Sequence, residues 1–212
     1  MKLTKYQHAC IVIEKEGTTL IVDPGTYSHD FIMPNNVDAI VITHEHPDHF
    51  DETLVQSILA THPKATIIAH ESISGRFTNF NAIAAKTDIP CTVGAYTLQF
   101  FGGTHAPIAA SIGVPSNLGV LIDSRLYYPG DSFVVPFGVQ VSELALPVSA
   151  PWLKISDAMD FLAQVRPAFA FPTHDAILSA EGKELVDRLL GTVAGGQETQ
   201  YKRLDGLSVE LS

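Results

Sequence analysis

The stretch Thr43–Phe50 reads THEHPDHF and places three histidines and two acidic residues within six positions. A chain with only nine histidines has little structural use for such a cluster, because imidazole and carboxylate groups pack poorly in a core. Neutral imidazole nitrogen and carboxylate oxygen are the usual ligands of Zn²⁺ and related ions. The stretch therefore predicts a metal-binding site.

Composition and charge narrow the class of protein. Apolar residues make up 46% and charged residues 17% of the 212 positions, which predicts one globular domain spanning residues 1–212. The net charge of −10, without a cluster of Lys and Arg, argues against nucleic-acid and membrane partners. The apolar runs are strand-sized and the first residues lack a secretory pattern, so we expect a cytoplasmic protein in which Cys10 and Cys91 are reduced.

Alternating apolar runs and turns predict an α/β domain. We expect strands at 3–6, 9–14, 18–22, 38–44, 65–70, 91–93, 96–101, 143–147 and 168–174, with a hairpin turn at Asp123-Ser124. We expect helices from an Asp51 cap to Pro63, weakly over 71–86, from a Ser156 cap to Val165 and over 181–193, and a terminal hairpin around Asp205-Gly206.

Four of these strands end in a potential metal ligand: His44 with its cluster, His105, Asp131 and His174. A single histidine at a strand end is more often a hydrogen-bonded structural residue, but four ligand types after four apolar strands are hard to attribute to coincidence. Position 48 is Asp and Pro47 interrupts a helix, so the segment is not the helical H-E-x-x-H zinc motif. In a loop, His44 and His46 would project one way and Asp48 and His49 another, which can supply two neighbouring sites.

This set of residues resembles the metallo-β-lactamase superfamily. The family motif H-x-H-x-D-H matches His44, His46, Asp48 and His49, and its later motifs match at His105, at Asp131 in PGDS and at His174 in PTHD. Asp23 in IVDPG matches an acidic residue that supports the metal loop in the family, although VDPG is also a good turn by itself. The resemblance covers nearly the whole chain and implies a four-layer αββα sandwich with the site at one edge between the sheets.

The resemblance also implies a ligand scheme. The first metal would be held by His44, His46 and His105, the second by Asp48, His49 and His174, and Asp131 would bridge them. A hydroxide shared by the two ions would be the nucleophile, and Asp48 would have an added catalytic role in orienting it or moving its proton. The absence of cysteine ligands leaves Zn²⁺ as the default and also allows Mn²⁺ or Fe, which bind imidazole and carboxylate well.

The predicted function is hydrolysis of a lactone, ester or phosphodiester bond in a small cytoplasmic metabolite. The alternative is a metal-dependent redox protein or a metabolite-binding sensor on the same scaffold. His8 is a candidate for contact with the substrate or support of the metal loop, against a purely structural role. Arg76 and Lys154 are either substrate-binding cations or surface charges, and Trp152 either lines the pocket or packs in the core. The hydrophobic composition is compatible with a homo-oligomer, which no sequence feature establishes.

Overall fold

Two seven-stranded sheets form the centre of the protein, whose computed structural model describes residues 1–211. The first sheet runs, in spatial order, through β14 (Ser208–Glu210), β1 (Lys2–Lys5), β2 (Ile11–Lys15), β3 (Thr18–Val22), β4 (Ala39–Ile42), β5 (Thr66–Ala69) and β6 (Asn81–Ala84). The second runs through β13 (Gln200–Tyr201), β12 (Phe169–Thr173), β11 (Glu143–Pro147), β10 (Leu126–Tyr128), β9 (Leu118–Ile122), β8 (Tyr96–Gly102) and β7 (Cys91–Val93).

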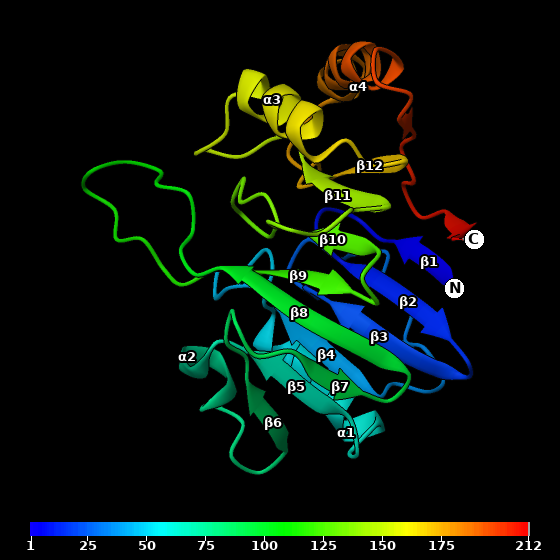
Figure 1. Cartoon of the computed structure of the whole chain (residues 1–212). Coiled ribbons are helices and arrows are strands. Elements are labelled where there is room, and N and C mark those ends of the chain that lie inside the picture. Colours follow the sequence, from blue (N-terminus) through cyan, green and yellow to red (C-terminus); the bar gives the residue numbers. More distant parts are fainter. Residues whose placement is uncertain (212) are drawn as a thin grey trace.

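Helices cover the outer face of each sheet (Figure 1). On the first sheet, α1 (Glu52–Thr61) shares a buried apolar cluster with β4 and β5, and the short α2 (Glu71–Ser74) lies beside them. On the second sheet, α3 (Ile155–Val165) and α4 (Ala180–Gly195) share another apolar cluster with β11. The four layers are therefore helix, sheet, sheet and helix, which confirms the predicted αββα fold class. Among residues 1–211, no helix combines the length and the hydrophobicity that a membrane crossing requires.

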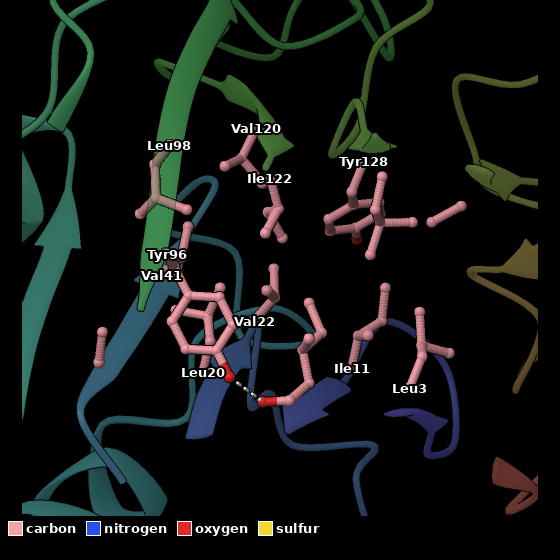
Figure 2. Close-up of a cluster of buried hydrophobic side chains, with 14 of the residues drawn as sticks. Leu3, Ile11, Leu20, Val22, Val41, Tyr96, Leu98, Val120, Ile122 and Tyr128 are labelled. Atoms are coloured by element: carbon pink, nitrogen blue, oxygen red, sulfur yellow. Dashed lines mark hydrogen bonds between the residues drawn. The ribbon is translucent and has the colours of Figure 1, made fainter. Parts of the chain in front are cut away.

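The central strands β3 and β4 of the first sheet are apolar on both faces, and both of these faces are covered. In β3, Leu20 and Val22 point into the cluster between the sheets, whereas Ile21 points into the cluster under α1. In β4, Val41 faces inward and Ile40 outward in the same way. Side chains alternate between the two faces of a strand, so a continuous apolar run is the expected sequence of a strand buried on both sides. Figure 2 shows the cluster between the sheets.

Tyr96 connects the two sheets. Its ring lies fully buried in the central cluster, and its hydroxyl group donates to the Ile13 carbonyl oxygen at 2.8 Å (Figure 2). Because Tyr96 begins β8 and Ile13 lies in β2, the bond fixes the second sheet against the first with the phenol group satisfied.

Three local predictions were wrong. Residues 71–86 are helical only over α2, and β6 follows as an edge strand parallel to β5, because pairing with a sheet outweighs a weak helix preference. The terminal segment is not a hairpin, since β13 pairs with β12 in one sheet and β14 with β1 in the other. Helix α3 begins at Ile155, so Ser156 lies inside it and Lys154 occupies the capping position without a side-chain cap bond.

Candidate metal centre

The site forms where four strands end at one edge of the two sheets. Thr43 and His44 follow β4, His105 follows β8, Asp131 follows β10 and His174 follows β12. The loop after β4 then turns back on itself, because the Phe50 backbone N–H donates to the His46 carbonyl oxygen at 2.9 Å. Asp51 accepts from the backbone N–H groups of the first turn of α1, as its sequence position predicted.

The turn Asp23-Pro24-Gly25 holds the ligand loop in place. The Thr26 backbone N–H donates to the Pro47 carbonyl oxygen at 2.8 Å. A Cβ atom added to Gly25 would lie 1.9 Å from the carbonyl oxygen of Asp48, so only glycine allows this close approach of two backbones. The turn formed by the end of IVDPG therefore packs directly against the loop of His44–His49 and fixes its position.

Asp23 is fully buried and binds the ligand loop through both carboxylate oxygens. Its Oδ1 accepts from the Thr43 backbone N–H at 2.8 Å, and its Oδ2 accepts from the Thr43 hydroxyl at 2.6 Å. The Oδ2 atom also lies 2.7 Å from Nδ1 of His49. A carboxylate only accepts, so Nδ1 of His49 carries a proton, and in the neutral form of the ring the lone pair is on Nε2. Asp23 therefore fixes the position of both Thr43 and His49 in the loop.

One group of side chains contains His44, His46, His105 and Asp131. One ligand atom from each lies within 4.8 Å of those of the others. Nε2 of His105 is 3.2 Å from Oδ2 of Asp131, while its Nδ1 donates to the Ala106 carbonyl oxygen. Burial lowers the pKa of His44 well below its usual value and also lowers the pKa of His46, so both rings are neutral at pH 7.

A second group contains His8, Asp48, His49 and His174, again with ligand atoms within 4.8 Å of one another. Nε2 of His174 lies 3.3 Å from Oδ2 of Asp48 and 3.1 Å from Oδ2 of Asp131. Nε2 of His49 lies 3.1 Å from the other oxygen of Asp131. Asp131 thus lies close to members of both groups.

Charge in this region is balanced by the histidines and carboxylates themselves. Burial alone would raise the pKa of Asp131, but the neighbouring His49 and His174 lower it well below its usual range. Burial alone would lower the pKa of His174, but Asp131 and Asp48 raise it to about 9. Asp131 is therefore ionised and lies among histidines that can carry positive charge.

Several buried polar atoms in the described residues lack a hydrogen-bond partner, and four of the five belong to this site: Nε2 of His44, Nε2 of His49, Nε2 of His174 and Oδ1 of Asp131. Burying a polar atom without a partner costs free energy, so a cluster of such atoms indicates a further ligand. All donors are nitrogen or oxygen, which suits Zn²⁺, Mn²⁺ or Fe. The residues present therefore fit divalent metal ions.

His8, which belongs to the second group, lies in the turn between β1 and β2. Burial lowers its pKa to about 4, so the ring is neutral at pH 7. Its Nδ1 accepts from the Ala176 backbone N–H at 3.3 Å, which places the proton on Nε2 and makes Nε2 a donor to Oδ2 of Asp48 at 3.0 Å. His8 also has a left-handed backbone with φ of 61°, a strained conformation for a residue with a side chain. It supports Asp48 rather than standing in the core for packing alone.

Trp152 has a contact that neither of its two predicted roles, lining the pocket or packing in the core, included. Its Nε1–H donates to Oδ2 of Asp131 at 2.8 Å, and its ring packs edge-on against His105 and against Phe133.

Arg76 forms an ion pair with Glu52 on the protein surface, and Lys154 is exposed at the start of α3. The remaining histidines lie outside the site: His62 bonds to the Pro34 carbonyl oxygen and His70 to Ser72 and Ser116, while His29 is exposed.

Asn117 holds Asp131 in position, a contact that the sequence did not predict. Oδ1 of Asn117 accepts from the Asp131 backbone N–H at 3.0 Å, and Nδ2 of Asn117 donates to the Pro129 carbonyl oxygen at 2.9 Å. Gly130 has a φ of 61°, and a Cβ atom there would lie 2.3 Å from Oδ1 of Asn117. The glycine of PGDS was the available signal for a constrained turn, but nothing in the sequence pointed to Asn117 as its partner.

Comparisons with known proteins show the family and the fold that this chain shares. Residues 2–174 match the Beta-lactamase superfamily domain. The chain is 38% identical to Protein Rv0786c of Mycobacterium tuberculosis over 86% of this chain and 88% of that one. It is 27% identical to a UPF0173 metal-dependent hydrolase of Aeropyrum pernix, over 82% of this chain and 81% of that one. Igni18, a metallo hydrolase of Ignicoccus hospitalis, superposes with a TM-score of 0.76 at 20% identity, covering 100% and 99% of the two chains.

Proposed function

The chain belongs to the β-lactamase superfamily, and from this premise we propose that it hydrolyses a small-molecule substrate with two divalent metal ions. The assignment as a metal-dependent hydrolase is supported by relatives that carry that description and by the fold shared with a metallo hydrolase. The finer proposal concerns the number of ions, the residues that hold them and the bond that is cleaved.

The proposed first ion is held by His44, His46 and His105, and the proposed second ion by Asp48, His49 and His174, with Asp131 shared between them. The observation that carries this proposal is the convergence of four unpartnered buried polar atoms, contributed by His44, His49, His174 and Asp131. Zn²⁺ is the default pair, with Mn²⁺ or Fe as alternatives on the same nitrogen and oxygen donors.

Two bound divalent ions supply a deprotonated water as nucleophile and a Lewis acid that polarises the scissile group. The protein orients the ligands for this chemistry. Asp23 fixes the tautomer of His49, and His8 donates to Oδ2 of Asp48. Asp48 is the most exposed carboxylate of the centre, with 24% of its side chain accessible, so it is the group that can reach a water molecule or a substrate and accept a proton.

The proposed substrates are lactones, esters or phosphodiesters of small metabolites, cleaved in the cytoplasm by a chain that acts as one hydrolase domain over residues 1–212. Nucleic acids are not proposed substrates, because the chain carries a net charge of −10. Sedimentation analysis would measure the oligomeric state that accompanies this activity.

Metal content measured by elemental mass spectrometry tests the proposal. We expect two ions per wild-type chain and fewer in Asp131→Ala, together with loss of ester and phosphodiester hydrolysis. His62→Ala is the matched control, because His62 is a histidine bonded to the Pro34 carbonyl oxygen outside the site, and it should keep both ions.

A chain that binds no metal after reconstitution, or that keeps two ions in Asp131→Ala, would contradict the proposed centre. Iron in the purified protein, accompanied by oxygen consumption and no hydrolysis, would instead favour the redox alternative.

A further inference from the structure

Two loop segments that follow proposed metal ligands carry no charged side chain. In the β8–β9 loop, residues 106–116 read APIAASIGVPS, and in the β10–β11 loop, after Asp131, residues 133–141 read FVVPFGVQV. Asp, Glu, Lys and Arg make up 17% of the whole chain, and surface loops are where they usually concentrate. The two loops therefore depart from the composition of the rest of the surface.

Both loops begin at proposed metal ligands and meet at their bases. The His105 backbone N–H donates to the Pro115 carbonyl oxygen at 3.0 Å, which closes the base of the β8–β9 loop. The Ala106 backbone N–H donates to the Asp131 carbonyl oxygen at 2.9 Å, which joins the two loop bases. Figure 1 shows the β8–β9 loop projecting well beyond the end of β8. A molecule that reaches the metal centre therefore has these loops beside it.

The loops expose large apolar side chains to water. Ile112 and Val114 are 48% and 50% exposed in the β8–β9 loop, and Val135 and Phe137 are 38% and 96% exposed in the β10–β11 loop. Exposed apolar side chains scattered singly are ordinary, but several on two joined loops at a functional site indicate a surface that binds apolar groups.

Three cations that could bind an anionic substrate are instead paired with carboxylates, whereas Lys154 is exposed at the start of α3. Lys5 is paired with Asp175 at 2.7 Å and Lys183 with Asp205 at 3.0 Å, and Arg76 is paired with Glu52. A site that recognises a phosphate or carboxylate usually presents an Arg or Lys to it. The two loops supply neither.

We propose that the site binds an uncharged ester, thioester or lactone whose apolar acyl portion lies against the β8–β9 and β10–β11 loops. This inference rests on the proposed hydrolase function and narrows its substrate class by setting phosphodiesters aside. In the reaction, the oxygen of water bonds to the acyl carbon and the bond from that carbon to the leaving oxygen or sulfur breaks. The leaving group takes up a proton, and the products are a carboxylic acid and an alcohol, thiol or, for a lactone, a hydroxy acid.

A chain-length series tests the inference. The metal-loaded protein is assayed with 4-nitrophenyl acetate, butyrate and octanoate and with bis(4-nitrophenyl) phosphate, using Asp131→Ala as the blank for uncatalysed hydrolysis. We expect kcat/KM to rise with acyl length by up to about fourfold for each methylene that the loops cover. The neutral esters should be cleaved faster than the anionic diester.

Variants connect the chain-length effect to the loops. Ile112→Ser and Phe137→Ser should each lower the ratio of octanoate to acetate cleavage by up to about tenfold. Ile32→Ser is the matched control, because Ile32 is 71% exposed and lies beside Lys2 and Glu14 of the first sheet rather than on either loop. It should leave the ratio unchanged.

Faster cleavage of the diester than of the esters, or a ratio that ignores acyl length, would overturn the inference and leave the hydrolase function standing. No cleavage of any substrate by fully metal-loaded protein would overturn both. The loops could instead bind a second copy of the chain, and sedimentation analysis tests this. If Phe137→Ser converts a dimer into a monomer and leaves the octanoate-to-acetate ratio unchanged, the inference is wrong.

Discussion

The hydrogen bond from Trp152 to Asp131 gives a prediction that follows directly from the geometry. Trp152→Phe keeps an aromatic ring beside His105 and Phe133, whose ring centroids lie 6.0 Å and 5.2 Å from that of the indole, but removes the Nε1–H that donates to Oδ2 of Asp131 at 2.8 Å. The variant thus removes one hydrogen-bond donor with little loss of packing volume.

The magnitude can be worked from the bond that is lost. A hydrogen bond to an ionised group is worth about 1.5–3 kcal/mol, and Asp131 is a buried, ionised carboxylate with two histidines beside it. Groups that orient a metal ligand from outside the coordination sphere typically contribute about 10–100-fold to metal affinity. We therefore expect Trp152→Phe to bind metal about tenfold or more weakly, and the free energy of unfolding of the metal-free protein to fall by about 1.5–3 kcal/mol.

Competition with a coloured chelator measures the metal affinity, and elemental mass spectrometry after dialysis measures the content. Because Trp152 is the only tryptophan, its fluorescence also reports metal addition to the wild-type protein. Phe133→Leu is the matched control, since it disturbs the packing around the indole but leaves the Nε1–H in place. Equal metal affinity in Trp152→Phe and wild type, with a loss in Phe133→Leu, would refute the argument and assign Trp152 a packing role.

The structure supports three more predictions. Asp23→Asn should lower metal affinity about tenfold, because an amide cannot accept hydrogen bonds through both of its terminal atoms; unchanged binding in a metal titration would contradict the role of Asp23. Gly25→Ala should destabilise the fold by about 2 kcal/mol or more in urea unfolding, since its Cβ atom would overlap the Asp48 backbone, whereas Gly191→Ala, where a Cβ atom has nothing within 4 Å, should not. Burial raises the pKa of both Cys10 and Cys91, but Cys10 is fully buried and Cys91 is half-buried, so a thiol reagent at pH 8 should label Cys91 first; mass spectrometry of the labelled peptides would show the reverse order if the burial were incorrect.

The sequence by itself determined the elements with strong patterns. Continuous apolar runs ending at Ile42, Ile122 and Thr173 indicated buried strands, and Asp51 before an amphipathic run indicated a helix start, because period and capping act over a few residues. The sequence also placed candidate ligands after apolar strands, because the histidines and acidic residues of THEHPDHF pack poorly in a core.

Only the tertiary structure decided how distant segments meet. The last strands look like a hairpin in sequence, but β13 pairs with β12 and β14 pairs with β1, so the two strands extend different sheets. Trp152 and Asn117 contact Asp131 although 21 and 14 residues separate each from it. No local pattern encodes such contacts, because they arise when β9, β10 and the start of α3 pack at one edge of the sheets.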